Sequence, residues 1–327
     1  MQYQPVDRPV DAFQQAVDPA VVPKLCRRAF GSATSVDAVI ELPWGAYNNA
    51  YRVELGTGRA VVLRVAPEAK RQFRVEQQMM RNEYAAAPYL AAIGDLLPRI
   101  LFADFTHQVI GRDYLIESLL PGVPAPDGMA RYPRPQWAGL FEQIGEVSRR
   151  IHSVRGSGFG SVADPRHEKW SAALVAYFRD AAADVRDAGH DWRDVSQLAT
   201  AAERFTVELD EITEPRLLHG DLWTANVLVD PETAALTMTG VCDWDRAKWG
   251  DPLADWAIQR ALLKPGTERE AFWTGYGQPR SVATGVRQLL YQARFAVELR
   301  LDRIRLRGAD SLADSYQEIG DILRRLD

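Results

Sequence analysis

The chain has 327 residues, of which 46% are hydrophobic and 25% charged, and its formal net charge is −5. This composition is typical of a globular protein, and the lack of a block rich in Lys and Arg argues against nucleic acid or an anionic membrane as the main partner. The sequence contains no run of 18 apolar residues, so we expect no membrane span, and its two cysteines lack metal-ligand spacing. Because the first residues do not resemble a signal peptide, we expect a cytoplasmic location.

The first 118 residues predict a lobe that is rich in strands. Scattered apolar positions and two prolines before residue 35 predict short helices packed on it. Alternating residues, a Gly-Thr-Gly turn at 56–58 and an apolar run then predict a β-hairpin. Residues 70–93 have a helical pattern, which we expect Pro88 to bend or split. The expected strands are residues 51–55, 60–65, 98–105 and 114–118.

The strand pattern largely disappears after residue 118. Residues 121–135 are rich in Pro and Gly and predict a loop. Apolar residues at helical spacing follow, and they predict an α-rich region. The expected helices cover residues 137–151, 170–185 and 195–212 and the tail from about residue 282. The coarse prediction is an α+β protein with a small β-rich lobe and a larger helical lobe.

The most informative stretch contains His219-Gly220-Asp221, then Asn226, and 17 positions later Asp243. A Gly-Asp-Pro segment with Asp251 follows, and Asp255 lies just beyond it. Phosphoryl transfer from a nucleotide needs one carboxylate that orients the attacking hydroxyl and accepts its proton. It also needs oxygen ligands, such as an amide and a second carboxylate, that hold Mg²⁺ on the nucleotide phosphates.

This arrangement resembles the aminoglycoside phosphotransferase/choline kinase family, the small-molecule relatives of protein kinases, over roughly residues 41–257. The resemblance implies a bilobal protein-kinase-like fold, with a nucleotide-binding lobe at 1–118 and a catalytic and substrate-binding lobe at 119–327. It implies that Asp221 is the catalytic base and that Asn226 and Asp243 are the ligands of Mg²⁺. Under the same resemblance, the residues that support the catalytic loop are His219, Asp251 and Asp255.

The first lobe resembles the family less closely. Residues 42–49 are similar to its nucleotide-covering loop, with Asn48 at the usual polar position. Arg64 stands where most kinases have the phosphate-binding Lys, and its guanidinium can grip the α- and β-phosphates. We expect Glu83 to pair with Arg64 from the following helix, with Glu76 as the alternative. The segment that resembles the nucleobase-binding hinge includes Glu117 and Leu119.

Acidic residues outnumber basic ones between residues 161 and 215. Members of the family that modify aminoglycosides bind a polycation with carboxylates of the helical lobe. By analogy, Asp180 and Asp184 are candidate substrate contacts, and Trp249 is a candidate aromatic wall. The alternatives are that these carboxylates decorate solvated helix faces and that the tryptophan packs in the core.

The resemblance implies an ATP- or GTP-dependent phosphotransferase that acts on a small-molecule hydroxyl. An antibiotic is the leading acceptor, in resistance, self-protection or biosynthetic tailoring. One alternative is a metabolite kinase for choline, a sugar, an amino acid or a fructosamine, since Leu222-Trp223 also resembles fructosamine-type kinases. The other is a nucleotide-binding pseudokinase scaffold, favoured only by Arg64 and the glycine-poor covering loop.

Overall fold

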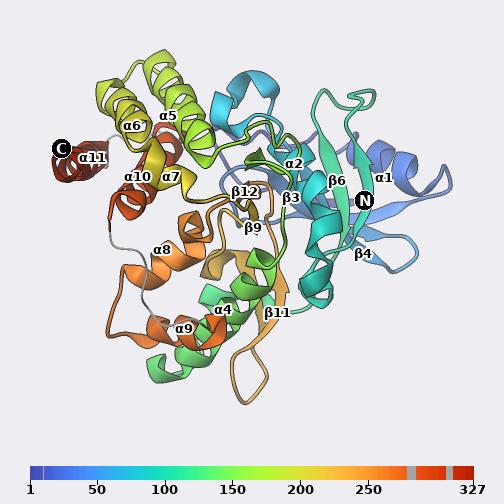
Figure 1. The fold of residues 1–327 in the computed structure, drawn as a ribbon. Coiled ribbons are helices and arrows are strands. Elements are labelled where there is room, and N and C mark those ends of the chain that lie inside the picture. Colours follow the sequence, from blue (N-terminus) through green and yellow to red (C-terminus); the bar gives the residue numbers. More distant parts are fainter. Residues whose placement is uncertain (10, 278–284, 307–311) are drawn as a thin grey trace.

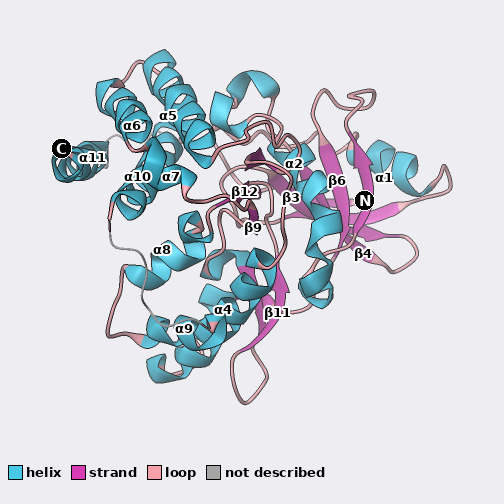
Figure 2. Ribbon diagram, in the orientation of Figure 1, coloured by secondary structure: helices cyan, strands magenta, loops and turns pink. Residues whose placement is uncertain are grey.

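The computed structural model describes residues 1–9, 11–277, 285–306 and 312–327, and it has a β-rich N-terminal region followed by a helical one (Figures 1 and 2). A six-stranded sheet, in the order β1-β2-β3-β4-β6-β5, forms the first region. Its strands are β1 (Gln2–Gln4), β2 (Val36–Glu41), β3 (Asn49–Leu55), β4 (Ala60–Val65), β5 (Ile100–Asp104) and β6 (Tyr114–Ser118). The predicted hairpin is confirmed as β3 and β4, which pair antiparallel.

The segment before residue 35 differs from the expected short helices. It contains one α-helix, α1 (Val22–Phe30), and it begins with β1, which pairs parallel to β2. Leu25 and Cys26 of α1 are buried in the cluster that also contains Tyr51 and Leu63 of the sheet. The apolar positions near the N-terminus therefore cover one face of the sheet.

The helical segment expected over residues 70–93 is divided into several short helices, and the bend or split expected at Pro88 coincides with the change from α2 to η3. Residues 69–96 form η1 (Ala69–Arg71), η2 (Arg74–Glu76), α2 (Met79–Ala86) and η3 (Ala87–Leu96). Gln78, with a φ of 62°, precedes α2, and this left-handed conformation interrupts any continuous helix. Pro88 lies in the first turn of η3, where its missing amide hydrogen removes no helical hydrogen bond.

The second region confirms the predicted helical pattern. Helices α4 (Ala138–His152) and α5 (Trp170–Asp187) match the first two predicted helices, whereas the third is interrupted at Phe205. The predicted loop at 121–135 also contains short elements. Those elements and the two halves of the third helix are β7 (Val123–Pro124), α3 (Ala125–Met129), the start of η4 (Arg134–Trp137), α6 (Arg193–Arg204) and α7 (Thr206–Asp210).

Short strands and turns form the centre of the molecule, between the sheet and the helices (Figure 1). Strands β10 and β11 pair antiparallel, and β12 lies between β8 and β9. The elements are β8 (Gly160–Ser161), β9 (Arg216–Leu218), η5 (Thr224–Asn226), β10 (Val227–Asp230), β11 (Thr237–Val241), β12 (Lys248–Gly250) and η6 (Pro252–Ala254).

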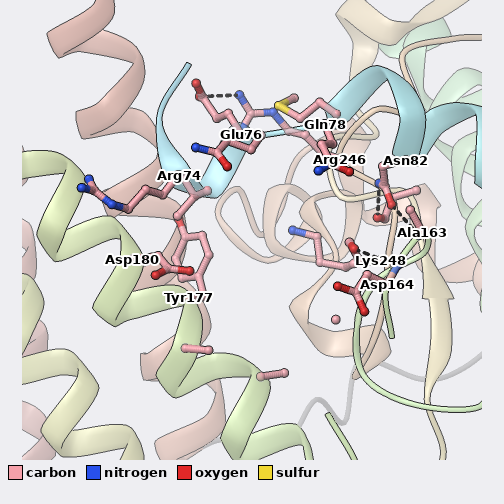
Figure 3. A pocket seen from close by; sticks show the side chains of 18 of the residues that line it. Arg74, Glu76, Gln78, Asn82, Ala163, Asp164, Tyr177, Asp180, Arg246 and Lys248 are labelled. Atoms are coloured by element: carbon pink, nitrogen blue, oxygen red, sulfur yellow. Dashed lines mark hydrogen bonds and ion pairs between the residues drawn. The ribbon is translucent and has the colours of Figure 1, made fainter. Parts of the chain in front are cut away.

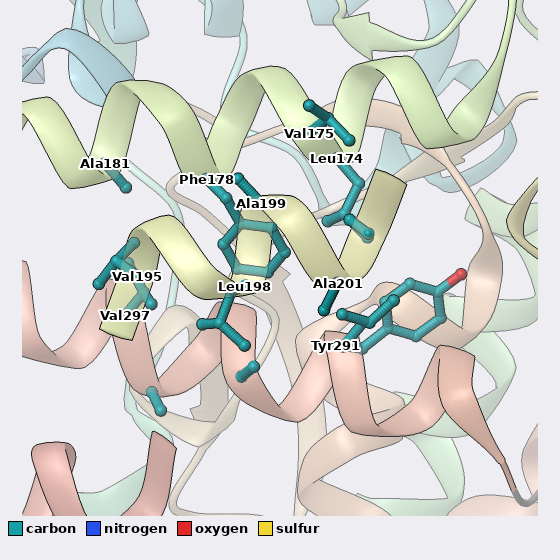
Figure 4. Close-up of a cluster of buried hydrophobic side chains, with 14 of the residues drawn as sticks. Leu174, Val175, Phe178, Ala181, Val195, Leu198, Ala199, Ala201, Tyr291 and Val297 are labelled. Atoms are coloured by element: carbon teal, nitrogen blue, oxygen red, sulfur yellow. The ribbon is translucent and has the colours of Figure 1, made fainter. Parts of the chain in front are cut away.

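The described part of the tail is helical, as predicted, and consists of α10 (Val286–Arg305) and α11 (Leu312–Leu326). Three further helices precede it and were not predicted from the sequence: α8 (Trp256–Leu262), η7 (Glu268–Glu270) and α9 (Ala271–Tyr276). The helix was expected from about residue 282, and residues 282–284 lie outside the described residues. Phe178, Leu198 and Val297 bring α5, α6 and α10 together in one buried cluster (Figure 4). Among the described residues, no helix is both long and apolar enough to cross a bilayer.

Arg305, near the end of α10, joins segments from both regions. Its guanidinium pairs with Glu76 of η2. The same group lies 5.0 Å from the ring centroids of Phe13 and Tyr47 and 5.7 Å from that of Phe73. One cation therefore contacts the N-terminal segment, the loop after β2 and the connection to α2.

Candidate active site

The pairing of β10 with β11 brings together three residues of the motif, Asp221, Asn226 and Asp243. Val227 pairs with Val241, so the residue before β10 and the residues after β11 lie side by side. The Cys242 amide donates to the Asn226 carbonyl at 3.0 Å and fixes this approach. Asn226 Nδ2 in turn donates to the Asp221 carbonyl at 2.8 Å and to Asp221 Oδ2 at 3.1 Å. The structure thus brings the three residues of the sequence motif into one site.

Arg64, on β4, connects this site to the sheet. Its Nη2 donates to Asp243 Oδ1 at 2.6 Å, and its Nη1 donates to Glu83 Oε1 at 2.5 Å. Glu117 Oε2 lies 3.8 Å from the same Nη1. Of the two expected partners, Glu83 pairs with Arg64, whereas Glu76 pairs with Arg305. One guanidinium therefore balances three carboxylates.

The electrostatics follow from burial of these charges. Burial raises the pKa of Glu83 to about 7, against the attraction of Arg64, and it also raises the pKa of Glu117. Burial likewise raises the pKa of Asp221 and that of Asp245, and the Asp243 charge adds to both increases. The site thus contains more carboxylates than cationic side chains. A metal cation or a positively charged ligand would stabilise the ionised carboxylates.

Asp255 lies beneath the loop that carries Asp221. Its Oδ2 accepts from the His219 amide at 3.0 Å and its Oδ1 from the Gly220 amide at 3.0 Å. His152 Nε2 lies 2.9 Å from Oδ2. Although burial opposes ionisation, the hydrogen bond and charge of His152 help lower the pKa of Asp255 to about 2. A buried carboxylate thus holds the backbone of the catalytic loop.

Gly220 has to be glycine. Its φ is 82°, and a Cβ there would lie 2.2 Å from the Arg246 carbonyl oxygen. The neighbouring His219 is fully buried, its ring centroid lies 4.1 Å from that of Trp244, and burial lowers its pKa. Its Nδ1 accepts from the Asp221 amide at 3.3 Å, so the packed ring also helps to hold the loop that carries Asp221.

Asp251 stabilises the segment that follows the second metal-ligand candidate. Its Oδ1 accepts from the Leu253 amide at 3.0 Å and caps η6, and its Oδ2 accepts from the Tyr291 hydroxyl at 2.7 Å. That hydroxyl also accepts from Trp170 Nε1 at 2.7 Å. Asp251 therefore connects this loop to α10 and α5.

The loop between β2 and β3 reaches the same site. Asn48 Nδ2 donates to Asp245 Oδ2 at 3.2 Å, so this loop contacts the segment after β11. The hinge-like segment follows β6, where the Glu117 side chain is buried and Leu119 is 42% exposed. The structure therefore gathers Asn48, Arg64, Glu83 and Glu117 around the motif, with Leu119 at its border.

A cavity of about 760 Å³ opens beside the site, between η2, α5, α10 and the loop that enters β12 (Figure 3). Asp180 and Trp249 belong to its lining. Trp249 is only 2% exposed, and its ring packs within 5.0 Å of that of Tyr89, centroid to centroid, so it is largely a core residue. The lining therefore offers Asp180 to a ligand more directly than Trp249.

The expectation that Asp184 contacts substrate is wrong. It is 3% exposed, and its carboxylate accepts from the Arg74 amide at 3.0 Å and from the Val75 amide at 3.2 Å. Arg74 Nη1 lies 2.9 Å from the same carboxylate. Asp184 therefore holds η2 against α5 and has no exposed surface for a ligand.

Sequence reasoning missed several residues of the site. Asp245 stands two positions after Asp243, and this spacing is a usable signal. Lys248 and Arg246 lie in the same block, but nothing in their spacing indicates a cavity. The lining also includes Tyr177, Arg294 and Glu298.

The β-rich and helical regions, with this motif between them, define a kinase-like phosphotransferase fold. The model of the phosphotransferase enzyme family matches residues 38–289, and the chain belongs to this family. Viomycin phosphotransferase of Streptomyces vinaceus is 29% identical over 158 residues, which are 44% of this chain and 48% of that relative. The match therefore spans about half the length of the curated relative.

Two solved structures have the same fold. A ternary complex of a thermostable variant of aminoglycoside phosphotransferase APH(4)-Ia with AMP-PNP and hygromycin B superposes with a TM-score of 0.64. It is 21% identical, over 93% of this chain and 98% of that one. A Thermobifida fusca protein assigned as a fructosamine-3-kinase has a TM-score of 0.59 and 21% identity, over 93% and 98% of the chains.

Proposed function

We propose that this chain transfers the γ-phosphoryl group of ATP or GTP to a hydroxyl of a small molecule, with an antibiotic as the leading acceptor. The observation that carries the proposal is the convergence of Asp221, Asn226 and Asp243 next to a large cavity. Arg64, fixed to Asp243, adds a cation on the nucleotide side. These are the groups that phosphoryl transfer requires.

In this proposal Asp221 orients the acceptor hydroxyl and takes its proton. The hydroxyl oxygen forms the new bond to the γ-phosphorus, the bond to the β-phosphate oxygen breaks, and the nucleoside diphosphate leaves. Asn226 Nδ2 donates to Asp221 Oδ2 and so orients this carboxylate. General-base assistance of this kind contributes about 10²–10⁴-fold to a rate.

Asn226 and Asp243 would hold Mg²⁺, which neutralises charge on the transferred phosphoryl group. The residues fit a hard cation, because Asn226 Nδ2 is engaged by Asp221 and leaves the amide oxygen as the ligating atom. No cluster of three His, Cys, Asp or Glu side chains that could enclose a metal occurs in the described ranges. Two protein oxygens with phosphates and waters are nevertheless an ordinary Mg²⁺ environment.

Arg64 would bind the α- and β-phosphates, and Glu83 would hold it in place. The segment from Glu117 to Leu119 would bind the nucleobase through its backbone, with Asn48 in the covering loop above the phosphates. The AMP-PNP complex of the APH(4)-Ia variant supports a nucleotide in this fold. His219, Asp251 and Asp255 are proposed as supports of the catalytic loop.

An antibiotic acceptor is supported by viomycin phosphotransferase and by the hygromycin B complex. Asp180, at the cavity, would contact a cationic group of such an acceptor, and Trp249 would form part of the inner wall. In this proposal the chain divides into two lobes. Residues 1–118 would bind the nucleotide, and residues 119–327 would bind the acceptor and carry out catalysis. A cytoplasmic location remains part of the proposal.

A metabolite kinase is the second candidate. Trp223, two residues after Asp221, is 39% exposed. The Thermobifida fusca neighbour is assigned as a fructosamine-3-kinase. An exposed indole beside the proposed base could stack on a sugar ring. A pseudokinase is less well supported, because the proposed base and both metal ligands are present and converge.

The test is a mass-shift screen with Mg²⁺ and either ATP or GTP. The panel contains aminoglycosides, peptide and nucleoside antibiotics, macrolides, choline, sugars, amino acids and fructosamines, and Asp221→Asn is the control. One added phosphate on one compound class, absent with the control, supports the proposal and identifies the acceptor. Tight nucleotide binding without transfer to any compound would favour the scaffold.

A further inference from the structure

The lining of the cavity beside the proposed base includes buried donor atoms that make no hydrogen bond in the described part of the chain. Lys248 enters it from β12, whose pairing with Leu218 and Ser161 fixes the backbone (Figure 3). Tyr177 stands on α5 on the opposite side, and Arg294 and Glu298 come from α10. We call these four residues the Lys248 cluster.

Three polar groups of the Lys248 cluster lack hydrogen-bond partners among the described residues. Arg294 is 2% exposed, yet its Nη1 and the Tyr177 hydroxyl are both buried without a hydrogen bond. Lys248 Nζ lies 3.8 Å from Glu298, beyond hydrogen-bond distance. Glu298 already accepts from Arg294 Nη2, so one carboxylate stands against two cations. The cluster thus has unused donors, and it carries a surplus positive charge when Lys248 is protonated.

The acidic residues of the cavity are largely compensated. Glu76 pairs with Arg305 and Asp164 pairs with Arg166, whereas burial raises the pKa of Asp245 and disfavours its charged form. Asp180 differs, because it lies on the exposed face of α5. The acidic side of the cavity is thus at its rim, and the donor-rich side is inside it.

An unpaired buried donor costs about 1–3 kcal/mol, so a ligand that accepts from such donors is favoured. Charged donors bind anionic oxygens more strongly than neutral ones. Arg246 lines the cavity, and its carbonyl oxygen lies against Gly220, next to the proposed base, where a Cβ would come within 2.2 Å of it. The cavity that holds the Lys248 cluster therefore adjoins the loop of Asp221, so that one bound molecule can reach both.

We propose that the acceptor carries an anionic group of the carboxylate class, which binds Lys248, Arg294 and Tyr177 inside the cavity. This inference rests on the proposed phosphotransferase function and narrows its acceptor. If the acceptor also carries a cationic group, that cationic group would bind Asp180 on the rim of the cavity. Zwitterionic hydroxy compounds are therefore preferred over pure polycations.

The protonation of Lys248 agrees with this arrangement. Burial, with the charges of Arg294 and Arg246, lowers its pKa to about 7, against the attraction of Glu298 and Asp255. A bound carboxylate adds a second negative charge beside the ammonium and favours its protonated form. Burial thus disfavours the ammonium form of Lys248 in the free cavity, and an anionic ligand would restore it.

The experiment compares D-glucuronate with D-glucuronamide, which differ in charge at one carbon. Dissociation constants are measured by ligand-observed NMR in the presence of ADP, for the wild type, Lys248→Met and Tyr177→Phe. Lys264→Met, which removes an exposed lysine outside the cavity, is the matched control. ADP affinity is measured on every variant to report on folding and on the nucleotide site.

We expect the wild type and Lys264→Met to bind glucuronate at least about tenfold more tightly than the amide. Lys248→Met should lose this preference, and Tyr177→Phe should weaken it, with ADP affinity unchanged in both. Equal binding of the two probes, binding of neither, or a preference that survives in Lys248→Met would overturn the inference. Failure of the wild type to bind ADP would instead count against the proposed function, because the probe comparison does not depend on turnover.

Discussion

Asp255→Asn removes the charge beneath the catalytic loop while keeping the size of the side chain. The two carboxylate oxygens accept from His219, Gly220 and Trp256 amides, and His152 Nε2 lies 2.9 Å away. The asparagine side chain has only one oxygen that can accept hydrogen bonds. Its NH₂ group would replace the second carboxylate oxygen and would leave the donors that now bind that oxygen without an acceptor. With about 1–3 kcal/mol for each buried donor left unpaired, the expected loss of unfolding free energy is about 2–5 kcal/mol.

The pKa of Asp255 provides a second route to this magnitude. Lowering it from 3.8 to about 2 corresponds to about 2 kcal/mol of stabilisation. Because the pKa is lower in the folded state, this stabilisation is complete above the unfolded pKa. It is lost as the pH falls from about 4 through about 2. The Asp255→Asn variant should therefore differ most from the wild type near neutral pH and converge with it in acid.

The assay is urea unfolding followed by tryptophan fluorescence at several pH values. Asp95→Asn, at an exposed position, is the control and should change the free energy of unfolding by less than about 0.5 kcal/mol. A loss below that value for Asp255→Asn at pH 7 would refute the reasoning. A loss that is the same at pH 7 and pH 2 would refute the assignment to the carboxylate charge.

Three further substitutions test the site. Asp221→Asn should lower turnover about 10²–10⁴-fold with ADP affinity nearly intact, and wild-type rates would show that the base is misassigned. Asp243→Ala should abolish the Mg²⁺ dependence of ATP binding in calorimetry, and an unaltered dependence would exclude it as a ligand. Arg64→Met leaves Glu83 and Glu117 without their cation and should cost about 3–5 kcal/mol of unfolding free energy and weaken ATP binding. Unchanged urea unfolding would contradict that last expectation.

The parts of the fold that follow from local patterns could be predicted from the sequence. Alternation over β3 and an apolar run over β4 predict the hairpin, and helical spacing predicts α4 and α5. The resemblance of the motif to the family predicts that Asn226 and Asp243 share a site. The residues between them form the adjacent strands β10 and β11, whose pairing brings the two ends together. Local chemistry specifies each of these features.

Other features depend on contacts between distant segments. Gln78 takes a left-handed conformation between η2 and α2, and no residue pattern indicates it. Asp184 has the sequence appearance of a solvated helical carboxylate, but η2 packs over it and takes its hydrogen bonds. The Lys248 cluster joins residues that are far apart in the chain, and only the packing of α10 against α5 and β12 brings them together.

Arg305 makes the two ligand regions interdependent. It pairs with Glu76, which lines the acceptor cavity, and it lies against Tyr47 in the loop that would cover the nucleotide. A ligand that shifts Glu76 would alter the support of this loop. Such coupling is reciprocal, so the factor by which an acceptor changes nucleotide affinity must equal the factor by which nucleotide changes acceptor affinity. Under the proposed function, this one guanidinium would thus link the acceptor side of the site to the nucleotide side.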